Sequence, residues 1–487
     1  MDPLHYLGLL IFFLLVVYKF ISQNRIQLKH LPPSPPGLPV LGHFHLLKRP
    51  FHLALHNLCK KYGPFLQLGS RSVLVISTPT AIEECFTKND IIFANRPRFP
   101  SRKVTEYNFT GLGTSPYGQH WRNLRRFIAL EIFSSRRLQM SSIIRVEEIH
   151  FLVNKLFRGS IEGVKKVEVK SLFYMLTFNI MMKMVVGERY FGDELGSDGT
   201  GGKYDDIRQT FNPTTQFALG DFYSILRWTF YGVNKKIQKV HRKRDDFAQA
   251  LINKRRVAKS SSLSDQKGKR TIIDVMLSLQ VSEPDYYTNN IIKGIIMAML
   301  IAGTETSAST MESAVLHLMC HPEVFKKARE EIDANVEDSR LLDDVDLAKL
   351  PYLHCSTGPI IPPHESSEEC TVGGYNIPRG TMLFVNAWAL HQDPNNWEDP
   401  NMFKPERFLG SEGEKGGYKF IPFGSGRRQC PGAGLAMRLM ALSLGILIQC
   451  FDWENTKEDI EDAEMNKAEM EIIFRPRKTL VSVLSQL

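Results

Sequence analysis

The pattern of apolar and polar positions separates a short apolar N-terminal segment from a long body with mainly helical periodicity. Residues 3–18 contain no Asp, Glu, Lys or Arg, and with Lys19 placed at the interface the apolar stretch reaches Ile21. At about 1.5 Å per residue, a helix over residues 3–21 spans roughly 28 Å, close to the hydrocarbon thickness of a bilayer. The pattern therefore predicts a transmembrane helix there.

A cleaved signal peptide is the alternative interpretation of this segment. It would need a basic start and a cleavage site with small residues, whereas Asp2 precedes the run and residues 18–22 offer no such site. Lys19, Arg25 and Lys29 follow the run, and basic residues flank the cytosolic end of a membrane helix. An uncleaved, single-pass signal anchor with a cytosolic body is the better interpretation.

The body is predicted to be mainly α with a small β region. Apolar helices are expected from about Thr288 to His321 and over Ala433–Cys450. Short strands are expected at Phe65–Leu68 and Val73–Ile76, and strands recur only near Val372–Val385.

Proline and small polar residues mark the connections. Stacked prolines in residues 32–39 predict a stiff hinge between the anchor and the body, residues 40–487. Residues 192–202 and 260–268 have the composition of loops. The hinge is expected to orient the body against the membrane.

Composition narrows the function classes. The 487 residues would allow three domains of about 150 residues or one large domain, and 43% hydrophobic with 23% charged residues excludes a disordered chain. The seven cysteines include no C-x-x-C pair, which excludes a disulfide scaffold, a zinc ribbon and a redox dithiol. No P-loop, H-E-x-x-H or strand-linked G-x-G-x-x-G is present. Any redox chemistry would therefore need electrons from another protein.

The net charge of +9 comes from one stretch. Residues 235–270 hold 13 Lys/Arg and 3 Asp/Glu, so the rest of the chain is nearly neutral. Such a run could favour nucleic acid or anionic lipid. It has no interleaved aromatic residues and no nucleic-acid fold signature. A solvated helix face is the better interpretation, and no nucleic-acid partner is expected.

The most informative segment is a glycine-punctuated loop directly before the second apolar helix. It reads Phe423-Gly-Ser-Gly426-Arg-Arg428-Gln-Cys430-Pro-Gly432. Glycines let the backbone approach a flat ligand and aim N–H groups at the sulfur, while the arginines and the helix N-terminus favour thiolate over thiol. A thiolate held in this way is a strong axial ligand for iron. A lone buried cysteine is ordinarily inert, but the F-x-x-G-x-R-x-C-x-G pattern is too specific for that interpretation.

The other informative segment, Ala302-Gly303-Thr304-Glu305-Thr306, lies in the first apolar helix. A mid-helix glycine costs about 1 kcal/mol, and an acid among apolar residues costs more unless it is partnered. A ligand against the helix would explain both, with Gly303 making room for a substrate or dioxygen and Glu305 and Thr306 relaying protons. A helix-packing glycine beside a solvent-facing acid is the alternative.

Together these two segments resemble those of a microsomal cytochrome P-450 of the plant type. The resemblance covers essentially the full length. The anchor with its hinge, Phe93-Ala-Asn-Arg96-Pro, Trp121-Arg-Asn-Leu-Arg125 and Pro405-Glu-Arg407-Phe408 agree with the family in order and spacing. The resemblance implies one mainly α domain with a small β region instead of three domains.

The resemblance also implies heme b as the cofactor, with Cys430 as the proximal ligand of its iron. Trp121, Arg125 and Arg428 match residues that bind the heme propionates, and two further positions resemble additional partners. The cofactor-binding positions implied in this way are Arg96, Trp121, Arg125, His364, Phe423, Gly426, Arg428 and Gly432.

Glu305 and Thr306 match the family's acid–alcohol pair, which delivers protons to iron-bound oxygen. A chain with both is expected to hydroxylate and not to rearrange peroxides. Thiolate donation favours O–O cleavage, and the protein places a C–H bond near the iron. Short sequence segments, such as Pro363-His-Glu-Ser-Ser-Glu368, resemble those of isoflavone- and flavonoid-hydroxylating members. A small hydrophobic or phenolic plant metabolite is therefore the expected substrate, together with O2.

The resemblance implies a partner and a location as well. The expected partner is an NADPH-dependent cytochrome reductase, a flavoprotein, and the expected location is the endoplasmic reticulum membrane. An arginine patch on the cysteine side of the protein would meet an acidic partner. Its expected members are Arg122, Arg126, Arg427, Arg428 and Arg438.

The resemblance fails in one place. In the family, a helix with Glu-x-x-Arg follows the Leu-Pro-Tyr-Leu landmark, and its Glu and Arg pair with the arginine that matches Arg407. Here Leu350-Pro-Tyr-Leu353 runs through residues 354–362 straight to Pro363-His364, roughly ten residues, or three helical turns, too few. Glu337 and Arg340 have the right mutual spacing but precede the landmark, so they are rejected as substitutes.

The missing helix predicts a heme-deficient, catalytically inactive variant as the alternative function. Arg407 would lose its charge partner, which could cost about 3–5 kcal/mol if it stays buried, against a total stability of about 5–15 kcal/mol. A splice variant, an annotation error or a degraded gene copy would each produce this sequence. A shorter clamp built from residues 354–362 is opposed by Gly358 and the nearby prolines. A non-catalytic membrane-anchored scaffold would share every other motif.

Overall fold

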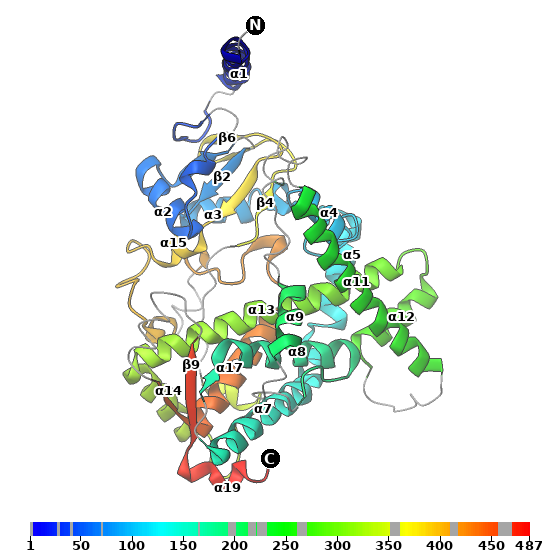
Figure 1. The fold of residues 1–487 in the computed structure, drawn as a ribbon. Helices are drawn as coiled ribbons and strands as arrows, with labels where there is room; N and C mark the ends of the chain where they lie inside the picture. Colours follow the sequence, from blue (N-terminus) through cyan, green and yellow to red (C-terminus); the bar gives the residue numbers. More distant parts are fainter. Residues whose placement is uncertain are drawn as a thin grey trace.

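The structure is a computed structural model that describes residues 3–26, 30–38, 42–69, 72–163, 166–192, 201–212, 221, 231–260, 270–350, 361–409, 417–455 and 470–487. The N-terminal helix α1 (Pro3–Ile26) extends away from the body (Figure 1). The strands within residues 65–76 and 364–385 lie on the side of the body next to α1, and the long helices lie beyond them, with β9 (Glu471–Pro476) among those helices.

The helices of the body follow the sequence in an order that alternates short connecting helices with long core helices. They are α2 (Phe51–Tyr62), α3 (Pro79–Phe86), α4 (Pro100–Thr105), α5 (Gln119–Glu131), α6 (Ser135–Met140), α7 (Ser142–Glu162), α8 (Val169–Val186), α9 (Gly201–Phe211), α11 (Tyr231–Ser260), α12 (Ile272–Ser282), α13 (Asn289–Cys320), α14 (Pro322–Asn335), α15 (Ala387–His391), α17 (Ala433–Cys450) and α19 (Val481–Leu484).

The strands form three small sheets. The largest has the order β1-β2-β7-β4, in which β2 pairs with β7 in parallel and the other pairs are antiparallel. The strands are β1 (Phe65–Leu68), β2 (Val73–Ile76), β3 (Val167–Glu168), β4 (His364–Glu365), β5 (Cys370–Val372), β6 (Tyr375–Ile377), β7 (Met382–Val385), β8 (Phe451–Glu454) and β9 (Glu471–Pro476). The predicted mainly α fold with a small β region is confirmed.

Local signals explain why the predicted boundaries agree with the structure. The Thr288 hydroxyl caps α13 by accepting the N–H of Ile291 at 3.4 Å, and Pro322 begins α14 directly after α13 ends. The predicted strands at residues 65–68 and 73–76 and the predicted helix at 433–450 have the observed bounds.

The predicted loop over residues 192–202 ends too late, because α9 already begins at Gly201. Residues 193–200 and 261–268 of the two predicted loops lie outside the described residues.

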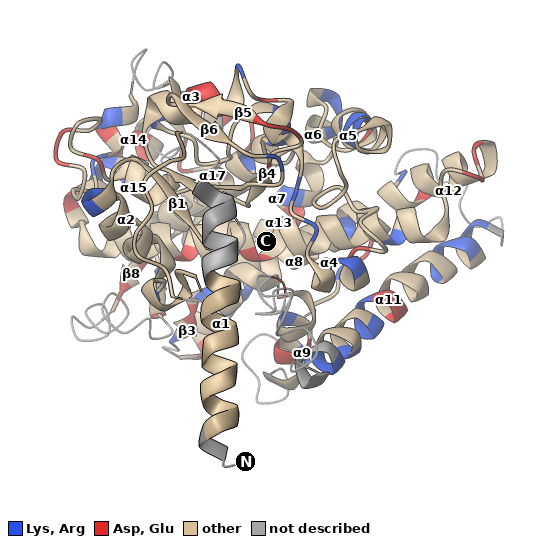
Figure 2. Cartoon of the chain, turned by 90° about the horizontal axis from the view of Figure 1, so that it is seen from above, with Lys and Arg blue, Asp and Glu red and all other residues tan. Residues whose placement is uncertain are grey.

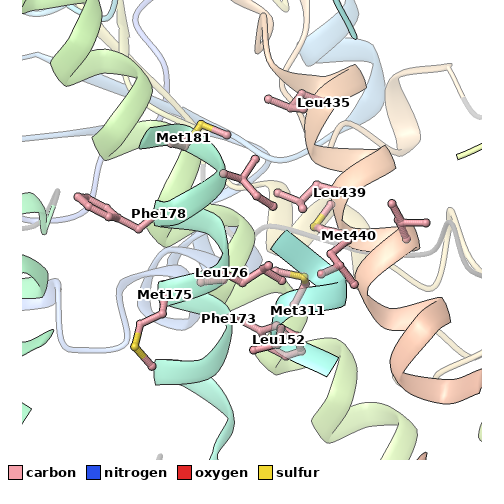
Figure 3. Packing of buried hydrophobic residues seen from close by; sticks show 14 of the residues in the cluster. Leu152, Phe173, Met175, Leu176, Phe178, Met181, Met311, Leu435, Leu439 and Met440 are labelled. Atoms are coloured by element: carbon pink, nitrogen blue, oxygen red, sulfur yellow. The ribbon is translucent and has the colours of Figure 1, made fainter. Parts of the chain in front are cut away.

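The core is built from helices that are apolar on nearly every face. Helices α8, α13 and α17 are each long and apolar enough to cross a membrane, but 83%, 67% and 72% of their apolar windows are buried inside the protein. Figure 3 shows Leu176 of α8 pointing toward Met311 of α13 and Met440 of α17. All-round hydrophobicity here therefore reflects a buried position in the body.

The N-terminal helix α1 is different. Between His5 and Tyr18 its large apolar side chains are exposed; Phe12 and Phe13, for example, are 66% and 62% exposed. A stripe of this kind on a soluble surface is unfavourable, so these side chains need an apolar environment outside the chain.

Candidate functional site

Arg428 lies at the centre of the predicted site and points into the protein. It closes a short 3-10 turn, Gly426–Arg428, and its guanidinium donates to the carbonyls of Ala94, Leu112 and Ser115 at 2.6, 3.2 and 2.5 Å. Its guanidinium carbon lies 4.5 Å from the ring centroid of Trp121, which is buried on α5. One side chain thus joins the cysteine loop to α5 and to residues 94–115.

The cysteine loop needs its glycine at 426. Gly426 has φ +67°, and a Cβ there would clash with the Asp90 carboxylate. Asp90 accepts the backbone N–H of Arg427 at 3.0 Å and pairs with its side chain at 3.2 Å. The carbonyl of Phe423 accepts the N–H of Cys430 at 2.9 Å, and Gly432 caps α17. The sequence reasoning missed Asp90, because an isolated acid 337 positions away carries no local signal.

His364 and Arg96 lie beside Arg428. His364, on β4, is 3% exposed, and its Nδ1 lies 2.8 Å from the carbonyl of Phe93. Arg96 donates to the carbonyls of Pro362 and Pro363 at 2.6 and 2.8 Å. Short-range contacts to residues 93–96 therefore place the imidazole and both guanidinium groups next to one another.

The electrostatics of this cluster are dominated by positive charge. Burial, with the neighbouring charges of Arg96 and Arg125, lowers the pKa of Arg428 to about 9. Burial and the charge of Arg102 lower the pKa of Arg96 to about 10. Burial, together with Arg96 and Arg428, holds the pKa of His364 well below 6.5. Within the described ranges, no carboxylate offsets the charges of Arg96, Arg125 and Arg428.

Cys430 is solvent-exposed and lies near Arg125. Protein atoms on the loop side still desolvate its sulfur, and this raises the pKa of the thiol above its ordinary value. The N–H groups of Gly432 and Ala433 and the charge of Arg125 act in the opposite direction. These N–H groups and Arg125 therefore favour thiolate, as predicted, but in the protein alone the desolvation of the sulfur outweighs them.

The predicted acid and alcohol lie on adjacent faces of α13. Thr306 is exposed, and its Oγ1 donates to the carbonyl of Ala302 at 2.6 Å. Glu305 is half-buried, and its Oε2 is shielded from solvent with no hydrogen-bond partner in the described structure. No contact among the described residues joins either side chain to the Arg428 cluster.

Gly303 lies where α13 contacts α8. A Cβ on Gly303 would lie 3.1 Å from Cγ of Met181 and would also clash with its sulfur, so the glycine allows α8 and α13 to approach closely. This contact favours the helix-packing alternative for the glycine, but the acid beside it is half-buried and not solvent-facing as that alternative required.

The predicted arginine patch needs one correction. Arg122, Arg126, Arg427 and Arg438 are exposed, but Arg428 is directed inward as described above. Residues 235–260 of the basic stretch lie on α11, and Figure 2 shows Lys and Arg residues along this helix. A separate cleft of about 880 Å³ lies between α5–α7 and helices α8, α11 and α12, and none of the predicted site residues lines it.

Arg407 is half-buried, and its hydrogen-bond partners among the described residues are backbone carbonyls. Its guanidinium donates to the carbonyls of Glu398, Asp399, Met402 and Lys404 at 2.9–3.2 Å. No ion pair to Arg407 occurs in the part of the chain that is described. Arg340 instead binds Asp346 at 2.6 and 2.8 Å, which agrees with its rejection as a clamp residue. Residues 351–360, where the family's clamp would stand, lie outside the described residues.

Sequence comparison identifies the family. Residues 32–483 match the family model described as "Cytochrome P450". The chain therefore belongs to the cytochrome P450 monooxygenases. Among them it belongs to the plant CYP81 group, as its relatives show.

Three relatives illustrate the similarity. The chain is 47% identical to cytochrome P450 81Q32 of Catharanthus roseus, covering 96% of this chain and 95% of the relative. It is 42% identical to the (+)-piperitol/(+)-sesamin synthase CYP81Q2 of Sesamum radiatum, covering 98% and 97%. It is 41% identical to an isoflavone 2'-hydroxylase of Glycyrrhiza echinata, covering 93% and 92%.

Proposed function

We propose that this protein is a heme-thiolate monooxygenase that hydroxylates a small hydrophobic or phenolic plant metabolite, with Cys430 as the iron ligand. One observation carries the proposal. The half-buried cations Arg96, Arg125 and Arg428 lie together near an exposed cysteine, and no described carboxylate offsets them. Buried charge of one sign requires a counter-charge, and the two propionates of heme b supply it.

The residues present fit this cofactor. Arg96, Arg125 and Arg428, with Trp121 and His364, would hold the propionate side, and the loop around Phe423, Gly426 and Gly432 would place Cys430 against the iron. Bound heme with a thiolate ligand supplies the activation of dioxygen. A metal charge beside the sulfur would also lower the thiol pKa, which the loop alone does not achieve.

Glu305 and Thr306 have the chemistry of a proton-delivery pair. The Thr306 hydroxyl is held on the exposed face of α13 by the carbonyl of Ala302, and Glu305 is the neighbouring acid. A carboxyl group next to an oriented hydroxyl can hold a proton and pass it on.

The substrate class rests on the relatives. One is named isoflavone 2'-hydroxylase and another isoflavone 3'-hydroxylase, so by name both hydroxylate an isoflavone.

We further propose a membrane-anchored protein with a cytosolic body in the endoplasmic reticulum, served by an NADPH-dependent reductase. The exposed apolar face of α1 supports the anchor. The exposed arginines Arg122, Arg126 and Arg438 support an acidic electron-transfer partner. If they bind it, Arg122→Glu with Arg126→Glu will lower reductase-supported turnover at low salt, and Lys236→Glu on α11 will not. Equal turnover of both variants would disprove the docking surface.

The ligand assignment is tested by the carbon-monoxide difference spectrum of the reduced, membrane-expressed protein. Cys430→Ala is expected to abolish the red-shifted thiolate band. Cys370→Ala, which changes a half-buried cysteine on β5, is expected to retain it. A red-shifted band in Cys430→Ala would disprove the assignment.

The heme-deficient variant is the second candidate function, and Arg407 is the observation that favours it. In the family the matching arginine is clamped by the Glu-x-x-Arg helix, whereas here its described partners are four carbonyls. Because Arg407 is only half-buried and the Asp399 carboxylate is an electrostatic neighbour, the predicted cost of about 3–5 kcal/mol for a buried, unpaired charge does not apply. The missing clamp would instead weaken the support of the cysteine loop.

Insertion of the relatives' Glu-x-x-Arg segment after Leu353 separates the two functions. If the chain is heme-deficient, the thiolate band per protein will be weak and will rise at least several-fold on insertion. A full-amplitude, stable band in the unmodified chain would show that the segment is dispensable.

A further inference from the structure

A polar strip runs along the interface between α8 and α13, on the side of α13 that carries Glu305. The two helices are antiparallel, as three contacts show. Met181 faces Gly303, the Thr177 hydroxyl lies 3.3 Å from the carbonyl of Thr304, and Lys170 lies 3.8 Å from the Glu312 carboxylate. Tyr174 therefore lies on α8 between the level of Thr304 and the level of Glu312.

Tyr174 has an unusual environment for a tyrosine. It is 1% exposed, it stacks on Phe178, and its ring meets Tyr204 of α9 edge-on at 5.6 Å. Its hydroxyl has no hydrogen-bond partner in the described structure. A buried hydroxyl without a partner costs about 1–3 kcal/mol, so such a group is normally bonded to another group or to ordered water.

Two further polar atoms share this condition. The Oε2 of Glu305 and the Oγ1 of Thr304 are also buried without a partner among the described residues. The charge of Glu305, after burial, contributes to the raised pKa of Tyr174, so the carboxylate and the phenol are electrostatic neighbours. Three unsatisfied polar atoms on one helix interface match the usual requirement of a buried water, which makes about three hydrogen bonds.

The outer end of the strip reaches solvent. Lys170 and Glu312 are 25% and 22% exposed at their side chains. Burial raises the pKa of Glu312, against the lowering effect of Lys170 and of Arg208 on α9, and the charge of Glu305 adds to the rise. A partly exposed carboxyl group with a raised pKa holds its proton at higher pH than an ordinary carboxyl group, and it can exchange that proton with solvent.

We propose that the Tyr174 hydroxyl, joined to Glu305 through a buried water, positions that acid and forms the inner end of a proton route that enters at Glu312. The inference rests on the proposed role of Glu305 in proton delivery. Each passage moves one proton inward. Glu312 takes a proton from solvent and gives it to a second water between itself and Tyr174, and the Tyr174 hydroxyl accepts a proton from that water as it gives its own to the bridging water. Glu305 receives a proton from the bridging water. No electrons move, and the hydroxyl is restored at every passage.

The first test needs neither bound heme nor activity. The thermal unfolding of the full chain in detergent is compared for wild type, Tyr174→Phe, Glu305→Gln and the double variant. A water-bridged pair predicts that Tyr174→Phe lowers Tm and that the double variant loses less than the sum of the single losses. Tyr287→Phe, which removes another buried hydroxyl far from Glu305, is the control. An unchanged or raised Tm for Tyr174→Phe, with additive losses, would disprove the bridge.

The second test measures the fate of electrons in the heme-loaded enzyme. Peroxide released per NADPH is expected to rise at least threefold in Tyr174→Phe, with a larger solvent isotope effect, and to rise less in Glu312→Gln. Tyr287→Phe is expected to match wild type. If Glu305→Gln uncouples and Tyr174→Phe behaves like Tyr287→Phe, the inference is wrong and the proposed function stands. If Glu305→Gln itself leaves coupling unchanged, the proposed role of Glu305 is wrong.

Discussion

Around α7, buried charges are neutralised by other residues of the chain, whereas around the cysteine loop they are not. Arg145 is fully buried and pairs with Asp344, and Glu148, at 1% exposure, accepts from Arg189 and Lys183. Arg428, by contrast, donates hydrogen bonds only to carbonyls among the described residues and lies among other cations.

The difference shows which region has its charges neutralised by the chain itself and which region needs a ligand. The α7 pairs stabilise the helix bundle without help, because each charge has its opposite in place. In the cysteine-loop cluster, carbonyls orient the guanidinium groups but leave their positive charge uncompensated. The fold therefore holds Arg96, Arg125 and Arg428 close together against their mutual repulsion, and an anionic ligand would reduce that repulsion. This arrangement is typical of a binding site that is organised before its ligand arrives.

Arg145→Met is expected to have the largest effect on stability. It leaves the Asp344 carboxylate beside an apolar side chain, and loss of one partner of a buried pair costs about 3–5 kcal/mol. The free energy of unfolding from denaturant titration measures the loss. Arg136→Met, an exposed arginine on α6, should change it little. Equal losses for both variants would show that the buried pair is not special.

Arg428→Met is expected to lower the free energy of unfolding less than Arg145→Met does, but to lower the heme content more. It removes three hydrogen bonds to carbonyls but also removes repulsion with Arg96 and Arg125, so the net loss should be about 1–3 kcal/mol. Heme per protein after purification should fall at least tenfold. In Arg145→Met, the protein that remains folded should keep the heme content of wild type. Normal heme content in Arg428→Met would contradict the role of the cluster.

His364 makes the cluster sensitive to acid. Its native pKa lies well below 6.5, so the unfolded chain takes up a proton at pH values where the native imidazole stays neutral. Stability should therefore be insensitive to this group above about pH 6.5 and should fall as the pH drops below it. His364→Asn should remove this part of the decline in a series of unfolding curves from pH 7 to pH 5. An unchanged slope would show that His364 does not titrate in this way.

The smallest effect is expected at an exposed pair. Lys254 and Glu188 form an ion pair in which both side chains are about half-exposed, and such pairs contribute about 0–1 kcal/mol. Lys254→Gln should lower the free energy of unfolding by no more than that, and less still in high salt. If Lys254→Gln lowered the free energy of unfolding as much as Arg145→Met, burial would not be what distinguishes strong ion pairs from weak ones.

The amino-acid sequence alone determined the elements and the chemistry of the cysteine loop. The boundaries of α13, α17, β1 and β2 follow from caps, prolines and periodicity, which act over a few residues. The family motifs that contain Cys430 and Arg428 are equally local, so they could be read without a fold.

Tertiary structure decided which way those residues face. Gly303 packs against Met181, and Arg428 turns inward to Ala94, 334 positions away, instead of joining a surface patch. Tyr174 carried no sequence signal at all, because its importance comes from the unpartnered Oε2 of Glu305 on another helix. Burial, pairing and pKa depend on neighbours that are distant in the chain, and local pattern carries no information about them.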